Sequence, residues 1–165
     1  MLAACSPQTQ APAQNLALNE PAPAPDAAQQ PQFDVLGQQP QKGLKDVPLT
    51  ISSKNGKHAF TVEVAATPQQ QETGMMFRTA VAPDRGMIFP YDPPQQVAFW
   101  MKNTLIPLDI VYIDAKGRIA RITHGEPLNL DPLPSGVPVT CVLEIGGGRA
   151  AQLGIQEGDA VSWSQ

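Results

Sequence analysis

Residues 99–114 of the chain read FWMKNTLIPLDIVYID, and this stretch indicates a fold built from β-strands. Lys102, Asn103 and Thr104 form a polar turn within it, and Pro107 restricts the residue before it to extended geometry. Alternating apolar residues flank the turn, with Val97, Phe99 and Met101 before it and Leu108, Ile110 and Tyr112 after it. A period of two residues is typical of half-buried strands. Polar side chains in so apolar a setting either satisfy their hydrogen bonds internally or present them in a cleft.

Short strands separated by turns are expected on both sides of this stretch. The Asn55-Gly56 pair is a strong hairpin signal, and it lies between two alternating apolar segments. Besides the two strands around the polar turn, strands are expected near residues 49–51, 60–64, 87–89, 118–124 and 137–145 and in a last segment that ends at Trp163. About seven short strands predict a mainly β fold, a compact barrel-like or sandwich-like domain.

One or two short helices are expected between the strands. Thr67, Pro68 and Gln70 fit an N-cap, a first helical position and a capping-box partner, which predicts a helix over residues 68–73. A second segment, residues 149–153, follows three glycines and is expected to form one or two helical turns.

The first part of the chain has a different composition from the rest. Residues 6–48 consist mainly of proline, glutamine and alanine, and they hold no lysine or arginine before Lys42. Such a segment cannot bury enough apolar surface to offset the entropy lost on ordering, so a disordered tether is predicted. The globular domain is therefore expected to span residues 49–165.

Residues 1–5 suggest how the chain is anchored. Leu2 to Cys5 spell LAAC, which resembles the lipobox at which bacterial lipoprotein signal peptides are cut and the cysteine is lipidated. A secretory signal needs a charged region and an apolar region before that site, so residues 1–5 are interpreted as the remnant of a longer signal. A lipid on Cys5 would place the protein on the periplasmic face of a membrane, the outer membrane in a Gram-negative cell. Chance occurrence of a four-letter pattern is the competing interpretation.

Composition and charge narrow the possible partners and cofactors. The net charge is −4 and no run of basic residues occurs, which argues against a nucleic-acid partner. The two histidines, His58 and His124, lack the spacing of metal ligands, and no motif for a cofactor is present, so neither metal nor cofactor is predicted. Cys141 alternates with apolar residues and is expected to be a small buried side chain rather than a nucleophile.

Five motifs occur in a fixed order along the predicted domain. They are GMMFR at Gly74–Arg78, GMIF at Gly86–Phe89, the WMKNT and PLD segments of the central stretch, VLEIGGG at Val142–Gly148 and GIQEGD at Gly154–Asp159. This pattern resembles the family called domain of unknown function 192, over roughly residues 60–163. The resemblance implies a compact, mostly β domain, and it implies no established activity.

Four charged residues within these motifs are the first candidates for a site: Arg78, Lys102, Asp109 and Glu144. Asp109 shares a strand face with apolar residues, and a buried carboxylate normally pairs or shifts its pKa; Lys102 or Arg78 is its expected partner. If Asp109 and Glu144 lay close together, they would form an acid/base pair. The full predicted ligand-binding set is Arg78, Trp100, Lys102, Asn103, Thr104, Asp109 and Glu144.

Three functions remain open on the sequence alone. The first is a lipid-anchored binding module of the cell envelope, without enzymatic activity, whose WMKNT and PLD residues form a polar cleft for a small ligand or an envelope protein. The second is a hydrolase or lyase that uses Asp109 and Glu144 as acid and base. The third is a structural or protein-interaction domain, in which the charged residues form only an internal network.

Overall fold

The computed structural model describes residues 38–164 of the chain. Cys5, the predicted signal remnant and the predicted tether up to residue 37 lie outside the described residues. Within the described part, no helix is both long and apolar enough to cross a membrane.

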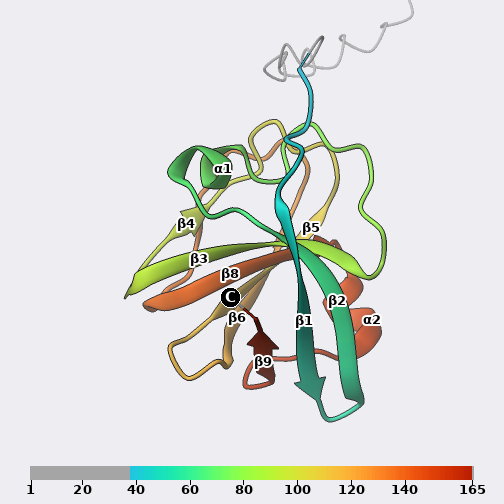
Figure 1. Ribbon diagram of the computed structural model, residues 1–165, viewed down its shortest axis with the longest axis vertical. Coiled ribbons are helices and arrows are strands. Elements are labelled where there is room, and N and C mark those ends of the chain that lie inside the picture. The colour runs from blue at the N-terminus through green and yellow to red at the C-terminus, as the bar shows by residue number, and fades with distance from the viewer. Residues whose placement is uncertain (1–37, 165) are drawn as a thin grey trace, which may run out of the picture. The chain divides into compact units, whose positions relative to one another are not determined.

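The domain is mainly β with two short helices, as predicted (Figure 1). One seven-stranded sheet has the order β6-β5-β8-β3-β2-β1-β9. Its strands are β1 (Lys45–Ser53), β2 (Gly56–Val64), β3 (Arg85–Gln95), β5 (Leu108–Ile113), β6 (Ile119–Gly125), β8 (Val139–Gly146) and β9 (Ala160–Trp163). Two further strands, β4 (Ala98–Phe99) and β7 (Leu133–Pro134), pair with each other, and the helices are α1 (Pro68–Thr73) and α2 (Arg149–Leu153). All neighbours in the large sheet are antiparallel except β2 and β3, which are parallel.

The large sheet curls but does not close into a barrel. Its two edges approach each other where Arg118 forms an isolated bridge with Ala160. The Ile119 amide donates to the Asp159 carbonyl at 2.9 Å, and the Val161 amide donates to the Gly117 carbonyl at 2.8 Å. Because this contact joins only the beginning of β6 to β9, the edges of the sheet stay separate over the rest of their length.

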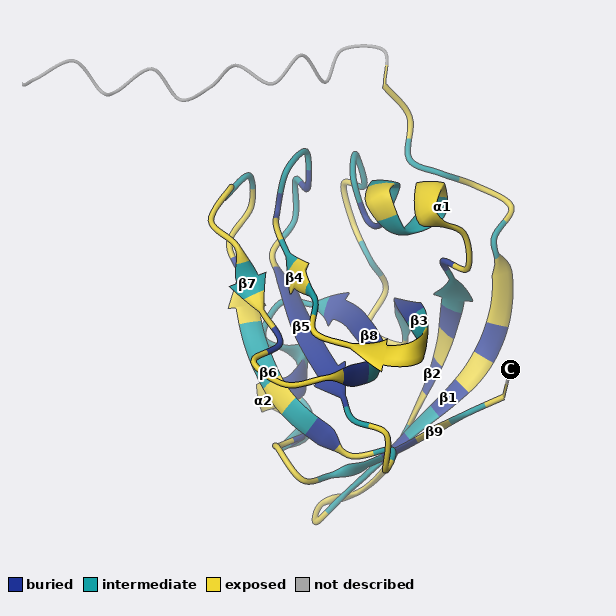
Figure 2. Cartoon of the chain, turned by 90° about the vertical axis from the view of Figure 1, so that its left-hand side faces the viewer, coloured by how far each residue is buried: buried dark blue, intermediate teal, exposed yellow. Residues whose placement is uncertain are grey.

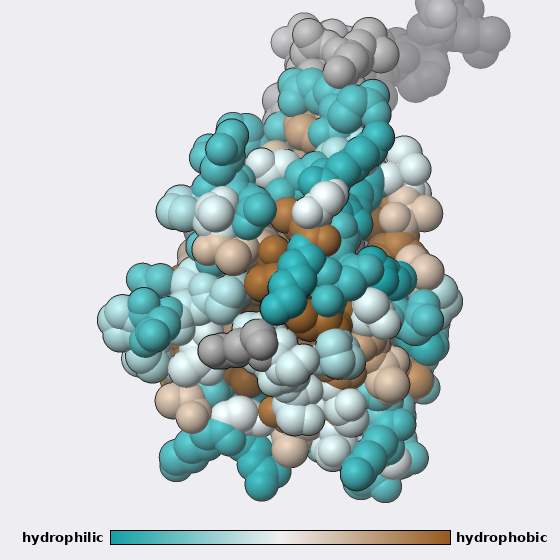
Figure 3. Space-filling view, in the orientation of Figure 1, coloured by the Kyte–Doolittle hydropathy of each residue, from teal (hydrophilic) through white to brown (hydrophobic). Residues whose placement is uncertain are grey.

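Apolar side chains form two cores, one on each face of the sheet. On β5, Val111 and Ile113 join the first core with α2 residue Ala150, whereas Leu108, Ile110 and Tyr112 join the second. Every residue of β5 is buried, as Figure 2 shows by its dark blue colour. The prediction that this strand is half-buried is wrong, because β5 lies between β6 and β8 and both its faces are covered. The surface in Figure 3 is mostly hydrophilic, with apolar side chains showing near its centre.

Several predicted boundaries shift for reasons that involve neighbouring strands. β1 begins at Lys45 rather than near Leu49, so residues 45–48 belong to the sheet and not to the predicted tether. This part of β1 pairs with β2 alone, since β9 ends at Trp163, opposite Leu49, and such an edge tolerates Pro48. β3 continues to Gln95 through the prolines that predicted a loop, and its register with β8 is irregular there.

The helix α1 begins as its sequence predicts. The Gln70 amide donates to the Thr67 hydroxyl at 3.2 Å, and the Thr67 amide donates to the Gln70 side-chain oxygen at 3.0 Å. This reciprocal capping box satisfies two amides that have no partner inside the helix. The helix ends at Gly74, where the chain turns toward the second core.

Candidate functional site

Asp109 anchors the helix α2 and does not face the polar turn of residues 101–104. Its carboxylate accepts hydrogen bonds from the Gly148 and Ala150 amides, each at 2.9 Å, and from the His124 Nδ1 atom at 3.1 Å. The cap of α2 is Gly148, which has no side chain to offer, so Asp109 supplies the missing acceptor. The prediction that Lys102 or Arg78 is the partner of Asp109 is therefore wrong. Asp109 on β5 lies opposite His124 on β6. A prediction of which residues face each other in this hairpin would have identified His124 as a partner of Asp109.

Glu144 lies on the opposite face of the sheet from Asp109. In the β5–β8 ladder Ile110 pairs with Glu144, and Asp109 pairs with Ile145. Paired residues of antiparallel strands point to the same face, and neighbours along a strand point to opposite faces. The predicted acid/base pair of Asp109 and Glu144 is therefore wrong, because a sheet separates the two carboxyl groups.

Glu144 is a buried carboxyl group at the edge of a small cavity. The residue is only 4% exposed, and its Oε2 atom has no hydrogen-bond partner among residues 38–164. We call the space beside it the Glu144 cavity; its volume is about 30 Å³ and its walls include Trp100, Thr104, Met75 and Phe99. Burial raises the pKa of Glu144 to about 8, although the positive charge of Arg78 acts in the other direction. At neutral pH most of this carboxyl is uncharged, so it can donate as well as accept a hydrogen bond.

Arg78 reaches the same face of the sheet but pairs with another carboxylate, Glu63. Its Nη1 atom lies 2.6 Å from Glu63 Oε2, and the two side chains are 18% and 14% exposed. Glu63 is opposite Met87 on β3, and Met87 is opposite Glu144 on β8, so both glutamates occupy one row across the sheet. The guanidinium thus has its ion pair in Glu63, and Glu144 remains without one. Glu63 was not among the predicted site residues, because Glu63 and Glu144 come to lie in one row only after the strands have paired.

Two turns cover the Glu144 cavity and contact each other. The Phe77 amide in the GMMFR turn donates to the Asn103 carbonyl in the WMKNT turn at 2.9 Å. Both residues have positive φ angles, 64° for Phe77 and 55° for Asn103, and such angles are uncommon for residues other than glycine. The Asn103 amide group also approaches the Met76 sulfur at 3.8 Å. The fold therefore holds two unfavourable backbone conformations beside the cavity, a feature that is common at functional sites.

The aromatic side chain at the mouth of the cavity belongs to Trp100, which is 45% exposed. The Lys102 ammonium lies 5.0 Å from the centre of the Trp100 ring, and Thr104 is buried with its hydroxyl 3.3 Å from the Lys102 carbonyl. Of the predicted ligand-binding set, Trp100, Thr104 and Glu144 line this one cavity. Arg78 lines another pocket, and Lys102, Asn103 and Asp109 do not line the Glu144 cavity.

We expect Lys102→Ala to change stability only slightly. Among residues 38–164 Lys102 has no ion pair, and its contact with Trp100 is a cation–π interaction at a partly exposed position, worth about 0.5–1 kcal/mol. Thermal unfolding of the variant and the wild type at one pH and salt concentration measures the difference. A fall of the midpoint by more than about 10 °C would show that Lys102 holds the turn in place.

Comparison with solved structures identifies two similar chains. A protein of unknown function from Novosphingobium aromaticivorans is 44% identical, with a TM-score of 0.73 over 76% of this chain and 90% of that one. A proposed transcription regulator from Sinorhizobium meliloti is 34% identical, with a TM-score of 0.72 over 74% of this chain and 97% of that one. A search of curated proteins finds no significant match.

Comparison with family models shows the family to which the chain belongs. Residues 50–163 match the profile of DUF192, described as an uncharacterised ACR. This range contains both covering turns and the strands β2, β3 and β8, which carry the row of Glu63, Met87 and Glu144. The chain therefore belongs to the DUF192 family, domain of unknown function 192.

Proposed function

We propose that the domain is a binding module for a small ligand that places an uncharged polar group beside Glu144, beneath Trp100. The observation that carries this proposal is the Glu144 Oε2 atom, which is buried and has no hydrogen-bond partner within the described residues. Folded proteins pair most of their buried polar atoms, so each exception needs an explanation. A ligand group that enters the Glu144 cavity would provide the missing partner.

The size and chemistry of the Glu144 cavity indicate what kind of group can enter. Its volume of about 30 Å³ corresponds to one water molecule, which suits a hydroxyl or an amide group. A neutral carboxyl can both donate to and accept from such a group. The positive charge that acts on Glu144 is that of Arg78, which already has an ion pair with Glu63, so an anionic group would gain less from this cavity than a neutral group. We infer that the inserted group is neutral.

The body of the ligand would lie outside, against Trp100. A hollow of about 290 Å³ is lined by Ala98, Phe99, Trp100, Leu130 and Pro132. Phe99 and Trp100 border both this hollow and the Glu144 cavity. Small-ligand sites typically combine aromatic and apolar walls with a few polar groups that fix orientation. A ligand with a flat or apolar face and one neutral polar end fits this arrangement.

The two tryptophans of the chain allow a direct test. In a Trp163→Phe variant Trp100 is the only tryptophan, and its fluorescence is titrated with three neutral probes: glycerol, N-methylacetamide and N-acetylglucosamine. We expect a saturable change with at least one probe, because the bound body covers the exposed indole. Adding Glu144→Leu should abolish the response, and the exposed Glu157→Gln should preserve it as a matched control. A response that survives Glu144→Leu, or no saturable response to any probe, would contradict the proposal.

Two alternatives to this binding module, an enzyme and a nucleic-acid-binding protein, receive less support. A hydrolase or lyase that depends on Asp109 and Glu144 as a pair conflicts with their positions on opposite faces of the sheet. The similarity to a proposed transcription regulator does not favour nucleic acid as a partner of this chain, whose net charge is −4.

We also propose that the protein is a lipoprotein of the cell envelope, attached to a membrane through a lipid on Cys5. The support is the LAAC sequence, followed by the proline-, glutamine- and alanine-rich segment before the domain. Expression from an upstream start in the presence of labelled palmitate should give a labelled product in the membrane fraction. Cys5→Ser should give an unlabelled protein in the periplasm, and an unlabelled wild type in the cytoplasm would refute the assignment.

A further inference from the structure

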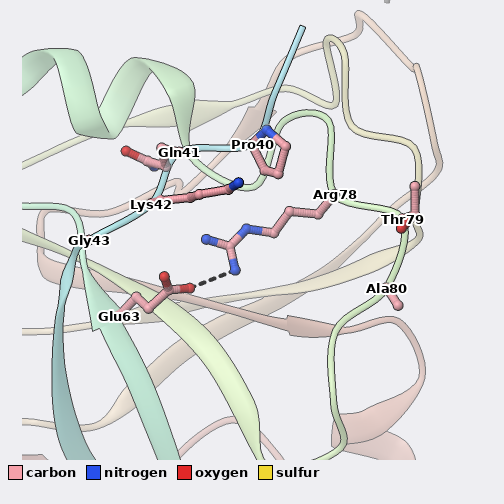
Figure 4. A pocket seen from close by; sticks show the side chains of 8 residues that line it. All are labelled: Pro40, Gln41, Lys42, Gly43, Glu63, Arg78, Thr79 and Ala80. Atoms are coloured by element: carbon pink, nitrogen blue, oxygen red, sulfur yellow. Dashed lines mark ion pairs between the residues drawn. The ribbon is translucent and has the colours of Figure 1, made fainter. Parts of the chain in front are cut away.

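A second and larger pocket contains Arg78 and lies next to the first described residues of the chain. Its volume is about 430 Å³, within the range of roughly 300–1,000 Å³ that is typical of small-ligand sites. We call it the Arg78 pocket, and its walls are Pro40, Gln41, Lys42, Gly43, Glu63, Arg78, Thr79 and Ala80 (Figure 4). Three separate parts of the chain therefore form it: the segment before β1, the strand β2 and the loop after the GMMFR turn.

The wall formed by residues 40–43 is fixed to the rest of the domain. The Gln41 side-chain amide donates to the Gln70 carbonyl at 3.0 Å and to the Gly74 carbonyl at 2.8 Å, at the end of α1. Figure 4 shows Gln41 directed away from the pocket while the neighbouring Lys42 extends into it. The hydrogen bonds of Gln41 thus hold the chain next to Lys42 at the edge of the pocket.

The charges in the Arg78 pocket do not balance. Lys42 and Arg78 are cations, and the one carboxylate in the lining, Glu63, is paired with Arg78 at 2.6 Å. Lys42 has no ion pair within residues 38–164, and in Figure 4 its ammonium points toward the guanidinium across the pocket. Glu144 also interacts with Arg78, but burial keeps most of it uncharged at neutral pH. The pocket therefore carries one positive charge in excess.

The guanidinium of Arg78 also has hydrogen-bond donors to spare. Glu63 accepts from Nη1, whereas Nε is buried and has no hydrogen-bond partner among the described residues. Figure 4 shows the other terminal nitrogen on the side of Gly43. A guanidinium has five N–H donors in a planar fork that matches the oxygens of a carboxylate or phosphate. The Thr79 hydroxyl, at the rim of the pocket, adds a neutral donor.

We propose that the Arg78 pocket binds a ligand through a carboxylate group, which is held between the Lys42 ammonium and the free edge of the Arg78 guanidinium. A single negative charge neutralises the excess in the pocket. A dianionic phosphate would leave one negative charge uncompensated beside Glu63. The site is separate from the proposed function, since it does not require Glu144 or Trp100.

Binding of small anions to the full chain tests this proposal. Acetate, N-acetylalanine and methyl phosphate are titrated at constant ionic strength, and the backbone amide resonances of Gly43, Thr79 and Ala80 are followed by NMR. We expect saturable shifts with acetate and N-acetylalanine. Lys42→Ala should weaken this binding by about tenfold or more, the usual range for a charged hydrogen bond. Lys45→Ala removes the same charge three residues further along, outside the pocket, and should leave binding unchanged.

Three results would overturn the carboxylate site. They are tighter binding of methyl phosphate than of acetate, equal losses in Lys42→Ala and Lys45→Ala, and the lack of saturable shifts with either carboxylate. The two proposals can fail independently. Glu144→Leu should leave carboxylate binding intact, and Lys42→Ala should leave the fluorescence response of Trp100 to neutral probes intact.

Discussion

Glu144→Gln is expected to stabilise the domain at alkaline pH by roughly 5 kcal/mol and to change its stability little below pH 4. The reason is the pKa of Glu144, which burial raises from 4.5 to about 8. One pKa unit corresponds to about 1.4 kcal/mol, so a difference of this size is a substantial part of a typical unfolding free energy of about 5–15 kcal/mol. Glutamine has a similar shape to a protonated glutamate and carries no charge at any pH.

The direction of the pH dependence follows from proton linkage. Between pH 4.5 and about 8 the unfolded chain releases the Glu144 proton while the folded chain retains it, so wild-type stability falls as pH rises. Above the folded pKa both states have lost the proton, and this contribution becomes constant. Tyr91 and Tyr112, whose pKa values are raised by burial, stay protonated in this range. The difference between the wild type and Glu144→Gln isolates the effect of Glu144, because every other titratable group is the same in both proteins.

Urea unfolding of the wild type and Glu144→Gln across pH 4 to 9 measures the effect. The difference in unfolding free energy between them should grow steadily up to about pH 8 and then level. Glu157→Gln, at an exposed position, should show no such growth. A difference of equal size at pH 5 and pH 8.5 would mean that Glu144 ionises normally, and the proposed neutral site beneath Trp100 would lose its basis.

Asp109→Ala is expected to cause the largest loss of stability, about 3–5 kcal/mol. The substitution removes a buried acceptor that binds the Gly148 and Ala150 amides and His124. Each buried amide left without a partner costs about 1–3 kcal/mol, and breaking a buried charged contact costs about 3–5 kcal/mol in total. In a domain of this size the midpoint of thermal unfolding should fall by roughly 10–20 °C.

Two further variants show whether the loss of stability is specific to the carboxylate of Asp109. Asp109→Asn retains one acceptor oxygen and should melt between the wild type and Asp109→Ala. Asp131→Asn changes an exposed carboxylate and should melt with the wild type. Hydrogen exchange adds a local readout, since the amides of Gly148 and Ala150 should lose protection in Asp109→Ala. A melting midpoint of Asp109→Ala within about 3 °C of the wild type would show that the Gly148 loop and α2 do not depend on this carboxylate.

Glu144 and Asp109 thus differ in the expected sign of their effects. Removing the charge of Glu144 should stabilise the domain, because the fold provides no partner for its Oε2 atom. Removing Asp109 should destabilise it, because the fold depends on its three hydrogen bonds. Residues that a fold retains at a cost in stability are typical of functional sites. The contrast favours Glu144 as the functional carboxylate and Asp109 as a structural one.

The sequence alone determined the features that depend on neighbouring residues. Alternating apolar residues predicted the strands, and Thr67 with Gln70 predicted the start of α1, because a capping box joins residues three positions apart. The five motifs identified the family, and the apolar face of β5 predicted that Asp109 is buried.

Only the tertiary structure decided which distant residues meet. Asp109 bonds to amides 39 and 41 positions later, and Arg78, in the segment between α1 and β3, pairs with Glu63 on β2. Glu144 is buried because β8 lies between β5 and β3 with both faces covered. Lys42 joins a pocket because Gln41 binds the end of α1, in a segment whose composition predicted no structure. The spacing of nearby residues determines the alternation of apolar residues along a strand and the capping of a helix. The contacts between distant residues depend on the order and register of the strands, which arise from packing of the whole chain.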